Sequence, residues 1–281
     1  MAESSSSQVI AAALRRADGA TLVLTGAGVS AASGIPTFRG EDEHAVWKHD
    51  ILELATRRYF VKDPVGSWRW YRARFSRLAL AQPNAAHSAL VEIERWHAGT
   101  SLQHFLLVTQ NIDLLHERAG SGRLVKIHGS SDLVRCSAGR CRGSAEPTPV
   151  AGIDFASFDE RPTLSTLPRC PLCRALMRPH ILWFDETYTS HPGYQWNRVA
   201  EASRSMRVVL AIGTSFSVTV TEYVGKVASV RGIPLIVVDP GDVEIAQFET
   251  PTLHVRERAE VILPVVAALL TSGRGEGRSA S

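Results

Sequence analysis

The 281-residue sequence lacks any long apolar run, and this absence excludes one large class of proteins. A helix that crosses a membrane needs about 20 consecutive, mostly apolar residues, and no stretch of the chain approaches that length. The opening residues, MAESSSSQ, also lack the cationic and apolar regions of a secretory signal. We therefore expect a soluble, cytoplasmic protein that has no membrane partner.

The sequence also lacks a strong charge of either sign. Its formal net charge is +3 and its pI is about 8.8. Proteins that bind nucleic acid usually concentrate basic residues on one face, so nucleic-acid binding is not indicated. The length allows one large domain, or a main domain with a smaller satellite.

Cysteine is scarce, and all four residues fall in one segment as two close pairs. The residues are Cys136, Cys141, Cys170 and Cys173. Four thiolates form the tetrahedral shell that Zn²⁺ prefers, and a shell filled by protein ligands leaves no position for a reacting water. Two disulfides or four reduced thiols are the alternatives, but disulfides are disfavoured without a secretory signal. We predict one structural zinc ion per chain.

Short apolar runs rich in β-branched residues recur along the chain and predict strands covered on both faces. They are residues 21–26, 105–110, 123–129, 207–213 and 234–240. Helical patterns lie between them, among them residues 85–99 and 217–232. Strands that alternate with helices predict an α/β fold, here a Rossmann-like, doubly wound parallel sheet.

Two segments interrupt this alternation and predict a small second lobe. Residues 41–80 are helical and rich in Trp, Arg and Tyr, whereas residues 131–179 contain the cysteines. The remaining residues, 1–40, 81–130 and 180–270, are assigned to the Rossmann-like domain. The polar, glycine-rich residues 271–281 are expected to be a disordered tail.

A polar or glycine-containing cluster follows almost every predicted strand. The clusters are TGAG (25–28), TQNID (109–113), HGS (128–130), GTS (213–215) and VDPG (238–241). Ligands of such sheets bind beyond the carboxyl ends of the strands, so we expect the clusters to share one cleft. Glycines directly after a strand suggest a turn pressed against a phosphate. An imidazole at such a strand end is a natural general base, whereas Asn111 and Asp113 could instead cap the helix that follows.

Several longer motifs occur together in a recognisable order. They are TGAGVSAASGIPTFRG (25–40), TQNID, HGS, the four cysteines, RPHILWFDE (178–186) and GTS. Over about residues 8–270 the chain thereby resembles the sirtuins, the NAD-dependent protein lysine deacylases. The resemblance implies that NAD is consumed: nicotinamide leaves, the acyl-lysine oxygen attacks the ribose, and lysine and O-acyl-ADP-ribose are released. The implied partners are NAD and acylated lysine side chains of proteins.

The resemblance also implies roles for individual residues. His128 would be the catalytic base that takes a proton from a ribose hydroxyl. Phe38 would shield the reactive anomeric carbon from water, and Arg39 would place a cation near phosphate or ribose oxygens. Gly213 to Ser215 would hold the adenosine half with N–H groups at a helix start. Together with Phe38 and Arg39, the implied cofactor-binding residues are Gly26, Ala27, Gly28, Ser30, Gln110, Asn111, Asp113, Gly213, Thr214, Ser215 and Asp239.

Three positions depart from the family pattern. Asp239 replaces the usual asparagine after a late strand, where a carboxylate still accepts from ribose hydroxyls. Asp185 replaces the glycine of Phe-Gly-Glu, which narrows the allowed backbone dihedrals. Glu257 stands where a glycine usually lies near the adenine.

Four residues are candidates for substrate binding. The resemblance implies this role for Trp183 and Phe184. Tyr71 and Arg74 lie three apart on a helical pattern and so share a face. In the sirtuin subfamily that prefers acidic acyl chains, such a pair binds the carboxylate of succinyl- or malonyl-lysine. The alternative is a solvated helix face. Acetyl-lysine should remain a substrate.

Two other functions stay open at this point. A mono-ADP-ribosyltransferase would transfer the ribose to a protein nucleophile, and a non-catalytic NAD-binding module would release no nicotinamide. Product analysis separates all three, because only the deacylase makes O-acyl-ADP-ribose.

Overall fold

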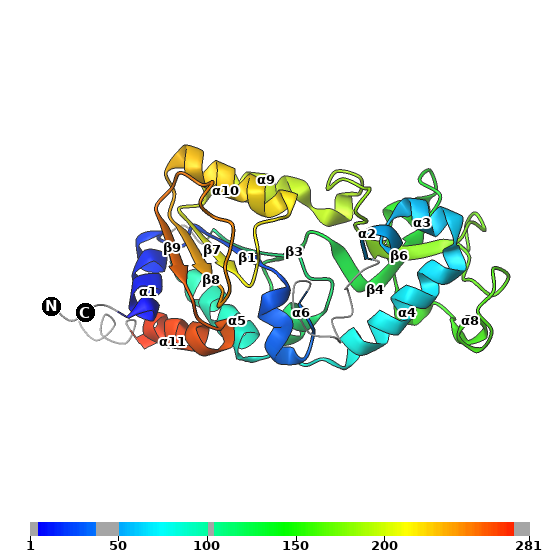
Figure 1. Ribbon diagram of the computed structural model, residues 1–281, viewed down its shortest axis with the longest axis horizontal. Coiled ribbons are helices and arrows are strands. Elements are labelled where there is room, and N and C mark those ends of the chain that lie inside the picture. Colours follow the sequence, from blue (N-terminus) through cyan, green and yellow to red (C-terminus); the bar gives the residue numbers. More distant parts are fainter. Residues whose placement is uncertain (1–4, 38–50, 101–103, 273–281) are drawn as a thin grey trace.

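The computed structural model describes residues 5–37, 51–100 and 104–272. Its larger lobe is built on a six-stranded parallel sheet, at the left of Figure 1. The strands in sheet order are β3 (Leu124–Lys126), β2 (Phe105–Thr109), β1 (Thr21–Thr25), β7 (Val208–Ile212), β8 (Leu235–Val238) and β9 (Thr252–Val255). Read in chain order this is 3-2-1-4-5-6, the doubly wound arrangement. The predicted fold class and its five strands are confirmed, and β9 is an additional strand.

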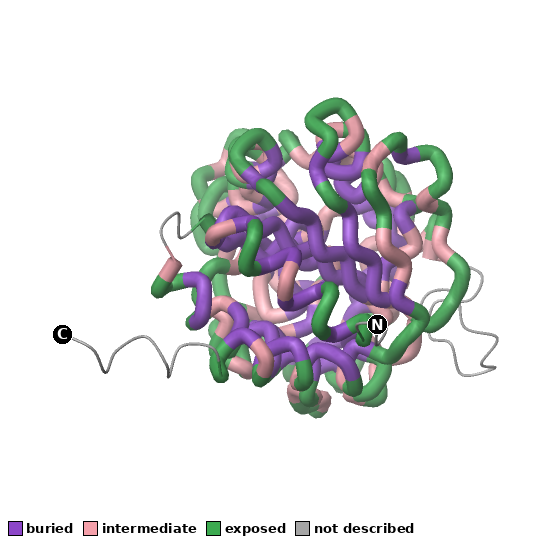
Figure 2. The backbone as a smooth tube through the Cα atoms, turned by 90° about the vertical axis from the view of Figure 1, so that its left-hand side faces the viewer, coloured by how far each residue is buried: buried purple, intermediate pink, exposed green. Residues whose placement is uncertain are grey.

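Helices cover both faces of this sheet. On one face lie α1 (Ser6–Arg16), α5 (Ala85–His97) and α11 (Ala259–Ser272), which share a core with the strands. The other face packs against α9 (Trp196–Ser205) and α10 (Thr219–Arg231). The strands β1, β2 and β7 are consequently buried at every residue, which explains their continuous apolar sequences. The buried stretches of backbone run through the middle of the lobe in Figure 2.

The smaller lobe has its own sheet and its own core. Its antiparallel strands, in sheet order, are β5 (Thr148–Pro149), β4 (Gly129–Cys136) and β6 (Met177–Ile181). Its helices are α2 (Ile51–Leu54), α3 (Arg57–Lys62), α4 (Pro64–Leu80), α7 (Arg142–Ala145) and α8 (Ala156–Glu160). Trp68, Tyr71, Phe158 and Trp183 are among its buried core residues. Residues 41–50 and 273–281 of the predicted insertion and tail lie outside the described residues.

Local sequence explains where α4 begins. Asp63 precedes the helix and its carboxylate accepts from the N–H of Gly66, at 2.8 Å. Pro64 then occupies the first helical turn, where no intrahelical N–H is required. In the described part of the chain, no helix is both long enough and apolar enough to traverse a bilayer.

Candidate cofactor and catalytic site

The carboxyl ends of the three central strands form one edge. Thr25 at the end of β1 pairs with Thr109 of β2 on one side and with Ile212 of β7 on the other. The clusters that follow these strands therefore start at the same level of the sheet. The strand order reverses between β1 and β7, and that crevice is where doubly wound sheets bind ligands.

Three glycines pack against one another at this edge. The N–H of Gly28 donates to the carbonyl of Gly213, at 3.0 Å. A Cβ on Gly26 would lie 2.6 Å from the Gly213 oxygen, and a Cβ on Gly28 would lie 2.6 Å from the Gly213 Cα. Gly213 itself has a φ of +58°, which favours glycine. The close approach of the two turns thus requires glycine at these positions. This packing requirement is separate from the phosphate contact that the sequence suggested.

The segment Gly213 to Ser215 does not lie at a helix start, which corrects that expectation. Helix α10 begins only at Thr219. Phe216 has a φ of +59° and is buried against Phe248, with ring centroids 5.5 Å apart. The left-handed residue Phe216 thus lies between the Gly213 turn and the start of the helix.

A buried polar network lies beneath the Gly26 turn. The side-chain amide of Asn111 donates to the carbonyl of Gly26 and to Oγ of Ser30, both at 3.0 Å. The Ser30 hydroxyl donates to Asp113, at 2.9 Å, and the other Asp113 oxygen accepts from the N–H of Leu115, at 3.0 Å. Asp113 therefore takes part in the network and also caps the turn into α6 (Leu115–Ala119).

Gln110 joins this network to the β7 turn. Its side-chain amide donates to Oγ1 of Thr214, at 3.0 Å. The cofactor candidates that follow β1, β2 and β7 are thus tied to one another by hydrogen bonds. Phe38 and Arg39 lie outside the described residues.

His128 has a defined tautomer. Its Nδ1 lies 2.8 Å from the carbonyl oxygen of Gln110, which can only accept, so Nδ1 carries the proton. Nε2 is then an acceptor, and the hydroxyl of Tyr188 donates to it at 3.1 Å. Burial lowers the pKa of His128 to about 4, which keeps the ring neutral near pH 7. A neutral imidazole with an unprotonated Nε2 is able to accept a proton.

Tyr188 is a residue that the sequence reasoning missed. Its ring stacks on His128, with centroids 5.8 Å apart and an interplanar angle of 16°, and on Trp196, at 5.0 Å and 14°. Trp196 in turn contacts Tyr223 of α10. The only signal in the sequence is a group of aromatic residues in a segment without periodicity.

Two buried histidines behind the site were also missed. Nε2 of His116 lies 3.0 Å from Oγ1 of Thr25, and the His87 ring lies 4.8 Å from the His116 ring. Burial lowers the pKa of both imidazoles. Asn84 caps α5 next to His87, and its side-chain amide donates to the carbonyl of Val29, at 2.9 Å. These residues support the turn after β1 from behind.

Two of the expected substrate residues, Tyr71 and Trp183, lie in the core of the small lobe. The indole N–H of Trp183 donates to the Tyr71 hydroxyl, at 2.7 Å, and the Arg178 guanidinium lies 3.3 Å from the centroid of the Trp183 ring. Phe184, by contrast, is 56% exposed. Leu182 follows β6 and donates its N–H to the carbonyl of His128, at 2.9 Å, which ties this loop to the base.

Tyr71 and Arg74 have different surroundings. Tyr71 is 1% exposed, which excludes a solvated face at this residue, and burial raises its pKa. The Arg74 guanidinium lies 3.8 Å from the centroid of the Trp70 ring and donates to the Trp70 carbonyl, at 3.1 Å. The structure thus brings Tyr71 to Trp183 and Arg74 to Trp70.

The three departures from the family pattern lie in ordinary conformations. Asp185 is not among the described non-glycine residues with positive φ, so this position does not use a glycine's conformational freedom. A carboxylate oxygen of Asp239 accepts from the N–H of Gly241, at 2.9 Å, and burial raises the Asp239 pKa. Glu257 is exposed between β9 and α11.

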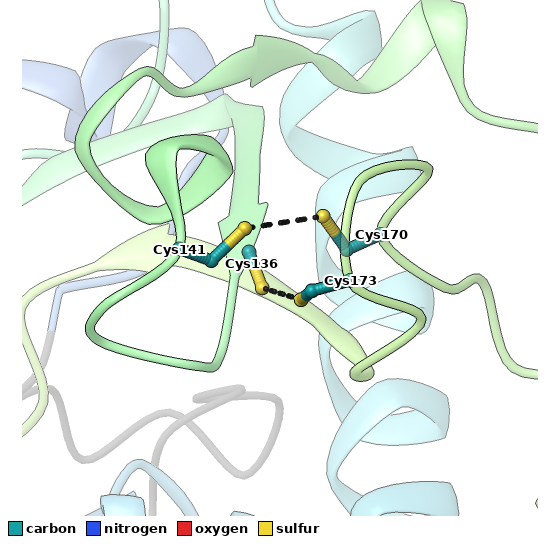
Figure 3. A group of neighbouring side chains, drawn as sticks. All are labelled: Cys136, Cys141, Cys170 and Cys173. Atoms are coloured by element: carbon teal, nitrogen blue, oxygen red, sulfur yellow. Dashed lines mark hydrogen bonds between the residues drawn. The ribbon is translucent and has the colours of Figure 1, made fainter.

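The four cysteines converge in the small lobe, as Figure 3 shows. Their sulfur atoms all lie within 4.8 Å of one another, with Cys136 and Cys173 at 3.4 Å and Cys141 and Cys170 at 3.7 Å. Zinc–sulfur bonds of about 2.3 Å in a tetrahedron place sulfurs about 3.8 Å apart, so the arrangement fits the ion. The distances exceed a disulfide bond, and the four thiols are free.

A cavity of about 750 Å³ lies elsewhere, between α3, α4 and α8. It is an open hollow on the small lobe, lined by Asp63, Arg69 and Asp159 among others, and it includes none of the candidate catalytic or cofactor residues. The cavity is thus separate from the candidate residues at the edge of the large sheet.

Comparison with known proteins matches residues 26–220 to the Sir2 family. The chain belongs to the Sir2 family. It is 38% identical to an NAD-dependent protein deacylase of Thermus thermophilus over 85% of each chain. It is also 36% identical to NAD-dependent protein deacylase 1 of Archaeoglobus fulgidus, over 83% of this chain and 86% of the relative. The solved structure of a Sir2 homolog–NAD complex superimposes with a TM-score of 0.78 at 31% identity, over 96% of each chain.

Proposed function

We propose that this Sir2-family chain is an NAD-dependent protein lysine deacylase. The observation that carries the proposal is His128, a neutral imidazole whose Nε2 is an acceptor at the ligand-binding edge of a doubly wound sheet. The relatives named as NAD-dependent protein deacylases support the same activity. NAD is the co-substrate, and zinc is the structural metal.

The described residues divide the work of NAD binding between two turns. The turn at Gly26 to Gly28 would approach the diphosphate, because it directly follows β1 at the ligand-binding edge of the sheet. Thr214 and Ser215, on the β7 turn, would hold the adenosine half. Ser30, Asn111 and Asp113 would meet the nicotinamide and its ribose, because their buried amide, hydroxyl and carboxylate groups lie together. The resemblance extends this set to Phe38 and Arg39.

His128 would act after nicotinamide has left. The Gln110 carbonyl holds the proton on Nδ1, so Nε2 is the atom that receives the proton of a ribose hydroxyl. The ribose oxygen is then free to attack the acyl carbon, and water completes the release of lysine and O-acyl-ADP-ribose. The four cysteines would hold zinc as a closed structural site that takes no part in these steps.

The acyl group is the finer part of the proposal. Because the Tyr71 hydroxyl accepts from Trp183, its own proton remains available to donate to a substrate carboxylate. An arginine one helical turn away would pair with the same carboxylate after leaving Trp70. We therefore propose succinyl- and malonyl-lysine as substrates beside acetyl-lysine, so that the protein would also be a desuccinylase and a demalonylase. The enzyme would be a transferase, because the acyl group passes to ADP-ribose, and it would act in the cytoplasm.

One experiment tests the assignment. The purified protein is incubated with NAD and peptides that carry acetyl-, malonyl- or succinyl-lysine, and the products are identified by mass spectrometry. Free lysine peptide with O-acyl-ADP-ribose is the expected result. ADP-ribosylated protein would indicate a mono-ADP-ribosyltransferase, and unchanged NAD would indicate a binding module.

A further inference from the structure

Asp185 makes a contact that joins two distant parts of the chain. Its Oδ1 accepts from the backbone N–H of Arg57, at 2.7 Å, and its Oδ2 accepts from the N–H of Arg58, at 3.0 Å. These are the first two residues of α3, whose N–H groups have no partner within the helix. A carboxylate also suits the positive end of a helix. Asp185 lies 128 residues from Arg57 in the sequence, so the contact is a tertiary one.

The contact is additional to ordinary capping of α3. Thr56 is the N-cap residue, and its Oγ1 accepts from the N–H of Tyr59, at 3.0 Å. The helix therefore already has its local cap. What the Asp185 carboxylate adds is attachment of the loop 183–186 to the helix.

The same loop is fixed on either side of Asp185. The N–H of Phe184 donates to the carbonyl of Ala55, at 3.0 Å. Glu186 forms a two-pronged ion pair with the buried Arg178 and accepts from the N–H of Trp183, at 3.2 Å. Held between these contacts, the loop carries the exposed ring of Phe184. A glycine, the residue that the family pattern has here, offers no carboxylate for α3.

We propose that Asp185 is a positioning residue that fixes the loop 183–186 on α3 in the conformation that receives the acylated peptide. This inference rests on the proposed assignment of Trp183 and Phe184 to substrate binding. Without the carboxylate the loop keeps the contacts of Phe184 and Glu186 but loses its attachment to the first turn of α3. Part of the binding energy of the peptide is then used to restore the receiving conformation.

The first test is Asp185→Asn. The amide group that replaces one oxygen would face a backbone N–H, so one of the two hydrogen bonds is lost. The KM for an acetyl-lysine peptide is expected to rise about fivefold to tenfold, while kcat and the KM for NAD change less than about twofold. A merely structural defect would lower kcat or the melting temperature instead.

A matched pair isolates the backbone donor. Arg57→Pro removes the N–H of the first helical residue, where proline is well tolerated, and Arg57→Ala removes the same side chain but keeps the N–H. The extended conformation of Thr56, with φ −129° and ψ 151°, is compatible with a following proline. Arg57→Pro should raise the peptide KM as Asp185→Asn does, whereas Arg57→Ala should not. The double variant should be no worse than either single variant, because both remove one contact.

Two further variants make the result decisive. Thr56→Ala weakens α3 without touching the loop, so a peptide KM that rises equally there would assign the effect to helix stability and overturn the proposal. Phe184→Ala tests the substrate assignment itself. An unchanged peptide KM in Asp185→Asn with a raised one in Phe184→Ala refutes the role of Asp185 alone. Unchanged values in both variants refute the substrate assignment and, with it, the positioning role.

Discussion

The hydroxyl of Tyr188 lies 3.1 Å from Nε2 of His128, and the two rings stack at an angle of 16°. The phenol hydroxyl is thus hydrogen-bonded to the nitrogen that would accept a proton from the ribose. The ribose hydroxyl has to replace the phenol hydroxyl at this nitrogen, whereas the ring stack is able to persist throughout the reaction.

Variants of Tyr188 separate the stack from the hydroxyl. Tyr188→Phe keeps the ring and should change kcat for deacylation less than about threefold, because the lost hydrogen bond is absent when the base acts. Tyr188→Leu removes the stack as well and should lower kcat about tenfold, because His128 loses its orientation. Steady-state kinetics on an acetyl peptide measure both. Equal losses in the two variants would show that the hydroxyl itself takes part in proton transfer.

His128→Ala should reduce deacylation by about 10²–10⁴-fold or more, since a general base supplies about that factor. Nicotinamide exchange precedes the His128 step in the proposed sequence, so exchange of labelled nicotinamide into NAD should survive. Zinc content and far-UV circular dichroism serve as controls for folding. Near-normal deacylation by a folded variant would remove His128 from its proposed role.

Arg74→Met should change the preference among acyl groups. Methionine keeps an apolar contact with Trp70 but cannot bind a carboxylate, so kcat/KM for succinyl-lysine should fall about tenfold to a hundredfold. Acetyl-lysine has no carboxylate, and its kcat/KM should change little. The selectivity ratio is the measurement, and an equal fall for both substrates contradicts the acidic-acyl reading.

Tyr71→Phe is a less clean variant for the same question. It would also leave the buried indole N–H of Trp183 without its acceptor. A loss of about 1–3 kcal/mol in the free energy of unfolding is expected, which urea denaturation would detect.

Cys170→Ser should release zinc and loosen the small lobe, because a tetrahedral site loses one of four thiolates. Metal analysis by mass spectrometry should show about one zinc per wild-type chain and much less in the variant. Ser157→Ala, at an exposed position of the same lobe, is the control variant and should leave the zinc content unchanged. A metal-free wild-type protein with intact activity contradicts the zinc assignment.

Stability should fall in mild acid. Burial lowers the pKa of His87 to about 4 and that of His180 to about 3, from 6.5. Between these values and 6.5 the unfolded chain binds more protons than the folded one. The free energy of unfolding therefore falls as the pH drops below about 6.5, by up to about 1.4 kcal/mol per pH unit for each group.

Urea unfolding at about pH 7, 6 and 5 measures this dependence. His87→Gln removes one of the shifted groups and should show a shallower slope. Zinc content is determined at each pH, because acid also displaces the metal. Parallel curves for the variant and the wild type, at equal zinc content, would contradict the assignment of the slope to His87.

The sequence predicted the large sheet well because its strands are short, fully buried runs, as in TLVLT of β1. Strand β9 has the pattern of a half-exposed edge, and four residues of that kind carry little periodicity. The cysteine cluster was also predictable. A structural zinc ion requires four ligands, and the two closely spaced pairs of cysteines supply four thiolates.

The contacts around the candidate site were harder to predict. Nothing near Asp185 in the sequence indicates that its partner is α3, and nothing near His128 indicates Tyr188. Both contacts join residues that are far apart in the sequence, 128 and 60 positions respectively, so tertiary packing decides the partners rather than local pattern. For the same reason the sequence could place Tyr71 and Arg74 on one helix but could not show that Trp183 binds one and Trp70 the other.

The central place of β1 has a consequence for the growing polypeptide. β1 is made early, yet its neighbour β7 starts only at Val208, and Gly213 completes the turn against Gly28. A nascent chain that ends before β7 leaves the backbone N–H and C=O groups along one edge of β1 without their pairing partners. The crevice between β1 and β7 therefore forms only after β7 has been made, so stabilisation of the fold by bound NAD comes late in translation.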